Sequence, residues 1–350
     1  MSEKEPINIG TSQIGKGLKP LFFPDIDVYF KQSTINAVKT ISQLHSAGCK
    51  IVKGALLHDE HICLPDGNTN YFSRKRGNVI ESYRNIIERH VVSLGQMNEI
   101  CAEAKALNME LVFSIYDEAG LRFALEHDVI AIKIPSSNIV HEPLIRMAAE
   151  TSLPVILDTG RSLIYEIDRA VQWFSQSGHG PLIMQHSPPG PPHTADDAQL
   201  QRVCWLAKRY DAYDGLSDHG ITNDFMMASC AHDVDIIEKG ICMTEADDDI
   251  DIAHALPVTH VSELLASFDN IHKSMQKAPH IDLVRERSPQ DRMCLIAKND
   301  LQKDDVLSLQ TVSFAFPPAG VPVEEFSLVK GLRLNKAISK GHPITFGDLN

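Results

Sequence analysis

The chain has 350 residues, which exceeds one average domain and leaves room for a barrel with a small second domain. Lys and Arg number 33 against 46 Asp and Glu, so the formal net charge is −13, which argues against non-specific binding to nucleic acid or to an anionic membrane. The seven cysteines contain no CxxC pair, the first residues are polar and no apolar run approaches a membrane span, so we expect a protein of the reducing cytoplasm without a signal peptide.

The N-terminal part combines short regular elements with one long irregular segment. Residues 7–12 are predicted to form the first strand of the fold, and residues 51–54 the second. Between them, Ser33 is suited to cap a helix with one apolar face, and Gly48 is suited to end it. Residues 58–90 are polar and irregular, and a loop of that length inside a compact domain usually has a function.

A regular alternation of strands and helices begins after the capping box of Ser93 and Gln96, which opens a helix to about residue 107. Apolar runs of about five residues predict strands at 110–114, 129–134, 154–158, 181–186, 212–216 and 234–238. The helices that accompany them are predicted at 117–127, 141–151, 163–177, 196–209, 223–232 and 261–275. Eight strand–helix units predict a closed parallel (β/α)8 barrel, a TIM barrel, over residues 1–280.

The composition changes near Pro279, where the barrel pattern ends. The run from Arg285 to Pro289 has the character of a linker, and the residues after it show short strands and turns without a long helical pattern. A segment of this size is too small to complete a barrel. We therefore predict a compact β-rich domain over residues 288–350 that leans on a larger partner surface.

Polar residues follow two consecutive apolar runs near the end of the predicted barrel. Ser217, Asp218 and His219 follow the first of these runs, and the second ends in Glu238 and Lys239. Parallel strands place their carboxyl ends at one rim of a barrel, and barrel enzymes carry their active sites there. These side chains are therefore expected to lie near one another and to take part in chemistry.

Five short segments, each at the end of a predicted strand, carry a resemblance to a known family. They are Gly48 to Lys53, Ile132 to Ser136, Val155 to Gly160, Leu216 to His219 and Ile236 to Lys239. In this order they resemble the N-acetylneuraminate (sialic acid) synthase family, and the stretch from Arg287 to Gly341 resembles its C-terminal antifreeze-like (SAF) domain. The resemblance implies a TIM barrel followed by a SAF domain.

The resemblance also implies roles for residues at the carboxyl ends of the strands. Lys53 and Lys133 correspond to lysines that contact phosphoenolpyruvate, and Ser136 and Ser217 to serines that contact its phosphate. Asp251 corresponds to an aspartate that binds the sugar, and we place it with the two lysines in the catalytic group.

Two lysines at strand ends have a physical reason to take part in such a reaction. Their ammonium groups can neutralise the phosphate and the carboxylate of one small anion, which makes an electrostatic clamp. The alternative for Lys133 is a strand-end residue paired with an acid at the surface. The alternative for Ser136 is a turn serine that only bonds nearby backbone.

Histidines suggest a divalent metal ion, Mn²⁺ or Mg²⁺, as a cofactor. The resemblance gives His219 the position of a metal ligand, and neutral imidazole suits a divalent ion. Alternation along the sixth strand is expected to turn His186 inward, beside the strand that carries His219. We therefore predict His186 and His219 as a metal-binding pair, with a hydrogen-bonded structural histidine as the alternative for His186.

The chain departs from the family pattern at several of its functional positions. The segment 9–15, taken as the first-strand motif, lacks the glutamate and the Asn-His pair of the family. Asp158 stands where a phosphate contact is implied, so we count it among the substrate contacts. Gly240 replaces the second metal histidine, and the SAF loop 314–318 lacks the arginine that reaches the partner subunit's site.

These observations lead to a first expectation and two alternatives. The first is condensation of phosphoenolpyruvate with an N-acylated amino sugar to a nonulosonic acid for surface polysaccharide, by a homodimer whose SAF domain lies near the partner's barrel mouth. One alternative is a diverged relative that makes no such product and binds a sugar or a phosphorylated ligand. The other is a barrel lyase or isomerase that uses Asp158 as its acid or base.

Overall fold

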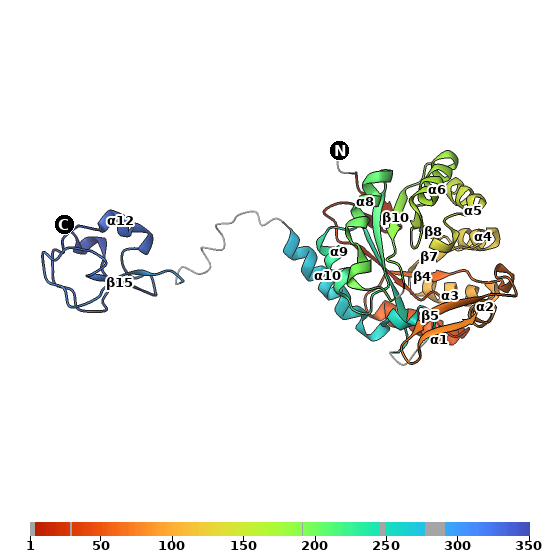
Figure 1. Cartoon of the computed structure of the whole chain (residues 1–350), viewed down its shortest axis with the longest axis horizontal. Coiled ribbons are helices and arrows are strands. Elements are labelled where there is room, and N and C mark those ends of the chain that lie inside the picture. The colour runs from red at the N-terminus through yellow and green to blue at the C-terminus, as the bar shows by residue number, and fades with distance from the viewer. Residues whose placement is uncertain (1–3, 29, 191, 245–248, 277–290) are drawn as a thin grey trace. The chain divides into compact units, whose positions relative to one another are not determined.

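The computed structural model describes residues 4–28, 30–190, 192–244, 249–276 and 291–350. The chain divides into two compact units, Met1–Gln276 and Lys277–Asn350 (Figure 1). The predicted boundary between residues 280 and 288 lies outside the described residues. Each unit is therefore described by itself.

The first unit is a closed barrel of eight parallel strands, as predicted. The strands, in their order around the ring, are β3 (Leu21–Asp25), β4 (Ile51–Ala55), β7 (Glu110–Ser114), β8 (Ala131–Ile134), β9 (Val155–Asp158), β10 (Leu182–His186), β11 (Tyr213–Asp218) and β12 (Ile236–Cys242). The pairing of β12 with β3 closes the ring. A short strand β13 (Leu256–Pro257) adds to the end of β12.

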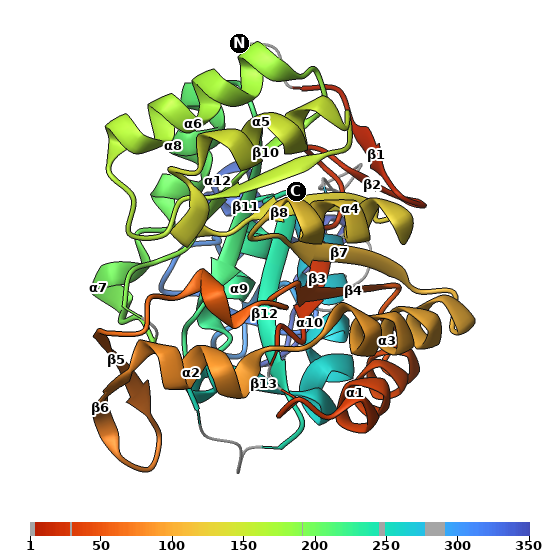
Figure 2. The same cartoon turned by 90° about the vertical axis from the view of Figure 1, so that its right-hand side faces the viewer.

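Helices surround the strand ring, as Figure 2 shows. They are α1 (Thr34–Ser46), α2 (Tyr83–His90), α3 (Leu94–Ala106), α4 (Glu118–Glu126), α5 (Glu142–Glu150), α6 (Ile164–Ser177), α7 (Ala195–Ala198), α8 (Gln201–Tyr210), α9 (Asp224–Ala231) and α10 (Val261–Met275). The helix predicted at 196–209 is two helices, because Gln199 takes a left-handed conformation with φ 41°. The capping box of Ser93 and Gln96 is confirmed at the start of α3.

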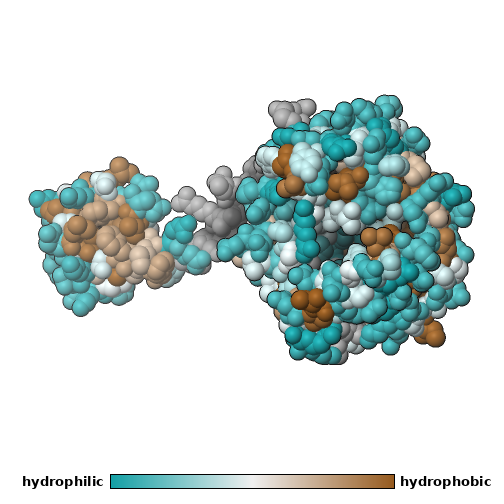
Figure 3. All heavy atoms as spheres, turned by 45° about the vertical axis from the view of Figure 1, so that its right-hand side comes forward, coloured by the Kyte–Doolittle hydropathy of each residue, from teal (hydrophilic) through white to brown (hydrophobic). Residues whose placement is uncertain are grey.

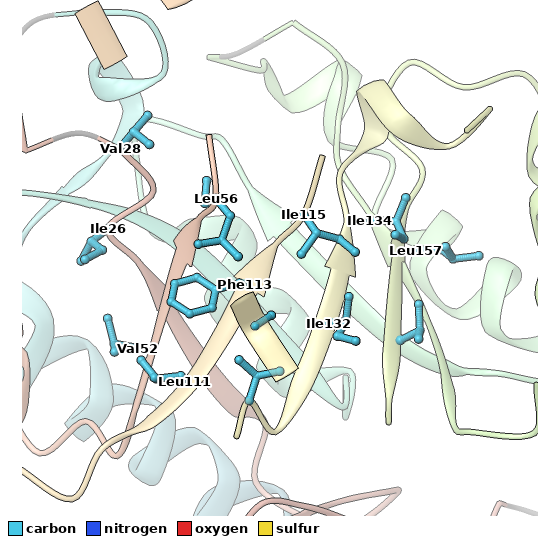
Figure 4. Packing of buried hydrophobic residues seen from close by; sticks show 14 of the residues in the cluster. Ile26, Val28, Val52, Leu56, Leu111, Phe113, Ile115, Ile132, Ile134 and Leu157 are labelled. Atoms are coloured by element: carbon cyan, nitrogen blue, oxygen red, sulfur yellow. The ribbon is translucent and has the colours of Figure 1, made fainter. Parts of the chain in front are cut away.

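The strand residues alternate between the barrel interior and the surrounding helices. Outward residues such as Val52, Leu111 and Ile132 pack in the layer between strands and helices (Figure 4). Inward residues at the N-terminal ends of the strands, called here the lower end of the barrel, form a second apolar cluster. It includes Ile51 and Ala131, the first residues of β4 and β8. Because side chains alternate, the next inward position on each strand lies two residues further on.

The next inward layer is charged rather than apolar. On four strands a charged residue lies two positions after an apolar residue of the second cluster. The pairs are Ile51 and Lys53, Ala131 and Lys133, Ile156 and Asp158, and Ile236 and Glu238. An apolar floor thus supports a charged layer at the carboxyl ends of the strands, where such barrels carry their active sites.

The prediction that residues 7–12 form the first barrel strand is wrong. Ile7–Ile9 (β1) pairs with Ser12–Ile14 (β2) in an antiparallel hairpin, and the first barrel strand is β3. Ile9 and Ile14 are buried in the same cluster as the apolar floor, so the hairpin closes the lower end of the barrel. The first strand-end position therefore belongs to Asp25, a carboxylate, and not to the segment 9–15.

The long segment 58–90 is ordered. It contains a 3-10 turn η1 (Glu60–Ile62), the antiparallel strands β5 (Asn68–Ser73) and β6 (Gly77–Ser82), and helix α2. Arg74 lies in the turn between the two strands and donates hydrogen bonds to the carbonyls of Ala253 and Ala255. The hairpin β5–β6 is thereby tied to the chain that follows β12.

The second unit is small and has its own core. Its strands β14 (Cys294–Ala297) and β15 (Val312–Ala315) pair antiparallel, and α12 (Phe326–Val329) is its one α-helix among the described residues. Ten buried residues, among them Leu295, Leu334 and Ile344, form this core.

The surface of the barrel unit is mostly hydrophilic in Figure 3, with apolar side chains in small separate groups. No helix within the described residues is long and apolar enough to cross a membrane.

Candidate active site

Two lysines and one glutamate form the centre of the charged layer. Lys133 Nζ lies 2.6 Å from Glu238 Oε1, and Lys53 Nζ lies 3.7 Å from the same oxygen. The three residues come from β8, β4 and β12, so the barrel brings together strands that are far apart in the sequence. The expectation that Lys53 and Lys133 converge at one rim is confirmed by this shared partner.

Two further carboxylates complete a chain of alternating charges. Asp25 forms an ion pair with Lys53, and Asp158 Oδ2 lies 2.9 Å from Lys133 Nζ. All five side chains belong to residues that are 7 % exposed or less. Three carboxylates against two lysines give the cluster a formal charge of −1, so both ammonium groups are already neutralised.

Neutral donors complete the hydrogen bonding of Glu238. Ser217 Oγ donates to Glu238 Oε1 at 3.0 Å, and Gln185 Nε2 donates to Glu238 Oε2 at 3.2 Å. Ser217 is opposite Glu238 in the parallel register of β11 and β12. The expectation that these two residues lie together is confirmed.

The environment shifts the pKa values of this cluster in opposite directions. Burial raises the pKa of Asp25 to about 6, although Lys53 counteracts the shift. For Glu238, burial acts upward, but Lys133 and Lys53 outweigh it and lower the pKa to about 2. Burial lowers the pKa of Lys133, but Asp158 and Glu238 outweigh burial and raise it above its ordinary value. The central pair is thus held fully charged at neutral pH.

A second buried ion pair lies on the opposite face of the same two strands. Lys239 Nζ lies 2.5 Å from Asp218 Oδ2 and donates to the carbonyl of Gly220 at 2.6 Å. His193 Nε2 lies 3.5 Å from Asp218 Oδ1. Asp218 and Lys239 each follow an inward residue, so alternation points them away from the Glu238 cluster.

His219 meets a second histidine that sequence reasoning did not select. Its ring lies 4.7 Å from the ring of His254, centroid to centroid, with the planes at 86°. His254 ends the 3-10 turn η3 (Ile252–His254), which follows β12 in the chain. The Nδ1 atoms of both rings are buried without a hydrogen-bond partner. Burial lowers the pKa of His219 to about 4 and holds the pKa of His254 well below its ordinary value, so both rings are neutral at neutral pH.

The predicted inward orientation of His186 is wrong. Its Nε2 atom forms a 2.9 Å hydrogen bond with the carbonyl oxygen of Ala198 in α7, in the layer outside the barrel. The preceding residue, Gln185, is the inward one, because it bonds Glu238. The structure therefore does not bring His186 and His219 together as a pair.

Ser136 and Asp251 lie at the same rim, outside the Glu238 cluster. Ser136 opens η2 (Ser136–Asn138) directly after β8, and a Cβ built on Gly160 would lie 3.2 Å from its Oγ, so it faces the turn after β9. Burial raises the pKa of Asp251 to about 6; the Arg161 guanidinium opposes the shift and the Asp25 carboxylate adds to it.

Three residues of this site were not selected from the sequence: Asp25, Gln185 and His254. Asp25 carried a signal, because it ends an apolar run, but the first strand was placed elsewhere. Glu238 was expected at the rim without an assigned role. Among the described residues, no group of three or more His, Cys, Asp or Glu side chains is arranged to hold a metal ion.

Comparison with known proteins identifies relatives for both units. The sequence profile of the NeuB family matches residues 40–279, and that of the SAF domain matches residues 292–350. The N,N'-diacetyllegionaminic acid synthase of Legionella pneumophila is 25% identical over 256 residues, 68% of each chain. The N-acetylneuraminate-9-phosphate synthase of Drosophila melanogaster is 23% identical over 72% of this chain and 75% of its own.

A solved structure shares the fold. The crystal structure of the N-acetylneuraminic acid (sialic acid) synthetase from Leptospira borgpetersenii matches with a TM-score of 0.71 at 20% identity. The match covers 82% of this chain and 96% of that one.

Proposed function

The chain belongs to the NeuB family, and from this we propose that it condenses phosphoenolpyruvate with the open-chain aldehyde of an N-acylated amino sugar to form a nonulosonic acid for surface polysaccharide. The observation that carries the proposal is the convergence of Lys53 and Lys133 on Glu238 at the carboxyl ends of the strands. The relatives named above make sugar acids of this class, which supports the type of product.

The two lysines suit the charges of phosphoenolpyruvate. This substrate carries a phosphate and a carboxylate, and two ammonium groups in a water-excluded site can hold both. The hydroxyl groups of Ser136 and Ser217 lie at the same rim and would donate to the phosphate. Asp251 would bind a sugar hydroxyl. Asp158 would share Lys133 with the incoming anion, since it already forms an ion pair with that lysine.

The atoms of the proposed reaction balance without a redox step. A carbon–carbon bond forms between C3 of phosphoenolpyruvate and the aldehyde carbon, and the aldehyde oxygen takes up a proton. Water adds at C2, inorganic phosphate leaves, and a 2-keto acid remains. A divalent cation, when bound, would polarise the aldehyde oxygen as a Lewis acid. His219 fits the role of its ligand, because its ring is neutral and its Nδ1 atom has no partner.

The test is release of phosphate from phosphoenolpyruvate with N-acetylmannosamine and related N-acylated sugars, with and without Mn²⁺. We expect sugar-dependent release that falls at least about 100-fold in Lys133→Met, because the clamp acts on the charge that develops in the reaction. Lys50→Met is the matched control, since Lys50 is an exposed residue at the opposite end of the strand that carries Lys53. Absence of release with every sugar would remove the proposal.

A second candidate function is a relative that binds a sugar or phosphorylated ligand without turnover. The excess of one carboxylate in the Asp25–Lys53–Glu238–Lys133–Asp158 cluster favours it, since an anion must compete with the carboxylates already bound. Sugar binding by calorimetry together with no phosphate release would support this candidate. The lyase or isomerase alternative requires Asp158 as acid or base, and substrate-dependent proton exchange that is lost in Asp158→Asn would support it.

We extend the proposal to the assembly and its compartment. By family resemblance, two protomers would form a homodimer in which the SAF domain of each lies near the barrel mouth of the other. The seven cysteines contain no CxxC pair, which suits a cytoplasmic location. Light scattering on the purified chain tests the dimer, and a monomeric mass would contradict it.

A further inference from the structure

We propose that His254 is the second imidazole of a divalent-cation site, paired with His219, and that Arg74 positions it. This inference deepens the proposed function and rests on it, because it names residues that would hold the cation of that site. The sequence places Gly240 where the resemblance implies the second metal histidine. The structure offers an imidazole at the same mouth from a later turn of the chain.

The geometry of the two rings suits one ion. Their centroids lie 4.7 Å apart and their planes are nearly perpendicular. Two imidazoles bound to one ion through nitrogens about 2.1 Å from it have centroids about 5 Å apart, given the angles between ligands in four- to six-coordinate sites. The observed separation of the two centroids is therefore compatible with a cation shared by the two rings.

Both rings have a buried nitrogen without a partner. Buried polar atoms are nearly always hydrogen-bonded, so two orphaned Nδ1 atoms in contacting rings require an explanation. Residue His254 is 2 % exposed. The neighbouring acids cannot supply the missing contacts, because Asp218 is bound to Lys239, and Glu238 to the two lysines. A bound ligand between the rings would satisfy them.

Arg74 holds the turn that carries His254. Its Nε atom donates to the carbonyl of Ala253 at 2.7 Å and its Nη2 atom to that of Ala255 at 3.2 Å. These two residues flank His254 in the chain. The hairpin β5–β6 thus fixes the backbone on both sides of the imidazole, which makes Arg74 a positioning residue rather than a ligand.

The site would remain open on the side of the substrate. Among the described residues, no third His, Cys, Asp or Glu completes a ligand group with this pair. Catalytic metal sites keep positions for water or substrate, whereas structural sites are closed by protein ligands. Oxygen atoms of the sugar aldehyde or of water would fill the remaining positions.

The test is a titration of the metal-free full-length protein with Mn²⁺ alone, in which free Mn²⁺ is followed by electron paramagnetic resonance. We expect one site per chain and at least a tenfold loss of affinity in His219→Ala and in His254→Ala. His254→Gln, which retains the bulk of the side chain, should show the same loss if His254→Ala fails to fold. Arg74→Ala should weaken binding a few-fold, and Arg74→Lys should recover part of it.

His186→Ala separates this pair from the pair predicted from the sequence. The His186 ring is turned toward Ala198, so its removal should leave Mn²⁺ affinity unchanged. The inference is overturned if the parent protein binds no Mn²⁺, if both His254 variants bind as tightly as the parent, or if His186→Ala loses the ion.

The readout is independent of turnover. Mn²⁺ binding that depends on His254, in a protein that releases no phosphate from phosphoenolpyruvate, upholds this inference and removes the synthase proposal. Phosphate release together with unaltered Mn²⁺ binding in His254→Gln upholds the synthase and removes this inference.

Discussion

Glu238 accepts contacts from four side chains that come from four different strands: Lys53, Lys133, Gln185 and Ser217. A buried carboxylate is tolerated only when its charge is paired and its oxygens are hydrogen-bonded. Here both conditions are met, and the two lysines hold the pKa of Glu238 far below its ordinary range against the effect of burial. Glu238 therefore contributes both to the stability of the barrel and to the charge of the site.

Glu238→Gln tests this dual role. Removing one partner of a buried ion pair costs about 3–5 kcal/mol of unfolding free energy, and we expect the lower end because each lysine keeps a second carboxylate. Since the folded pKa of Glu238 is depressed, its contribution is present above the unfolded value near 4.5 and is lost as the pH falls toward about 2. Urea unfolding at neutral and acidic pH measures both effects.

Ser217→Ala is the matched control for that experiment. It removes one hydrogen bond from a neutral hydroxyl to the same carboxylate oxygen and leaves every charge in place. We expect a loss of about 1.5 kcal/mol, the low end for a hydrogen bond to a charged group, because the two lysines still bind this carboxylate. A cost for Glu238→Gln that does not exceed that of Ser217→Ala would contradict the central role of the ion pairs.

The residues of the site differ in how far the sequence could reveal them. Lys53, Lys133 and Ser217 end apolar runs, so strand periodicity alone places them at the rim. Asp25 ends such a run too, but Pro24 weakens the pattern of a strand, because proline lacks the N–H group that a central strand uses. His254 lies in an irregular turn, and only tertiary contacts bring it to His219.

At the scale of elements, the hairpin β1–β2 shows why local pattern can mislead. Ile7 and Ile9 alternate with polar residues as a barrel strand would, and the sequence cannot tell a strand of the ring from one that closes its floor. Lys16 follows this hairpin and anchors the chain at the end of the barrel where the parallel strands begin. Its Nζ atom lies 2.9 Å from a carboxylate oxygen of Asp214 and 3.9 Å from one of Asp235. Asp214 is the second residue of β11, and Asp235 immediately precedes β12.

Asp235 makes this anchor sensitive to pH. Its carboxylate accepts the backbone N–H of Asp214, and Asp214 accepts that of Asp235, so two acids lie side by side. Burial, and then the charge of Asp214, raise the pKa of Asp235 from 3.8 to about 7. Because the pKa of Asp235 is raised in the folded state, its contribution to stability is complete at pH values below its unfolded pKa. This contribution is lost as the pH rises through the folded pKa.

Asp235→Asn should therefore become more stable relative to the parent as the pH increases. The amide oxygen can still accept the N–H of Asp214, while the buried charge is removed. Between about pH 4 and pH 8 the difference in unfolding free energy should grow by a few kcal/mol, since one pKa unit corresponds to about 1.4 kcal/mol. Urea unfolding at several pH values measures the difference.

Asp269→Asn provides the control for the pH series. Lys19 donates a hydrogen bond to Asp269 and lowers its pKa, so its contribution changes only below the ordinary range of an aspartate. The difference between Asp269→Asn and the parent should stay constant from about pH 5 to pH 8. If Asp235→Asn behaves in the same way, the anchor at the barrel floor does not titrate in that range.

At the scale of the whole molecule, the two units have separate cores. The barrel core consists of the outward layer and the apolar floor, and the SAF core consists of ten residues between Leu295 and Ile344. The change of composition near Pro279 predicted this division, because strand–helix alternation stops there. What the local pattern could not supply is the identity of contacts between distant segments, such as Arg74 with the turn of His254.

Separate cores predict separate unfolding transitions. At about 0.7 kcal/mol per residue, the unfolding enthalpy is about 190 kcal/mol for the 276 residues of Met1–Gln276 and about 40 kcal/mol for residues 292–350. Calorimetry of the full chain should therefore resolve a large and a small transition. A chain that ends at Gln276 should keep the large transition and lose the small one, because every residue of the barrel cores precedes that position.

The chain that ends at Gln276 also tests whether the proposed cation site requires the SAF domain. Lys53, Lys133, Glu238, His219 and His254 all lie within Met1–Gln276, so the proposed cation site is complete without the second unit. Mn²⁺ affinity of the shortened chain should therefore match that of the full chain within a factor of about three, less than 1 kcal/mol. A shortened chain that unfolds without a cooperative transition, or that folds and binds no Mn²⁺ when the full chain does, would show that the barrel depends on the SAF domain.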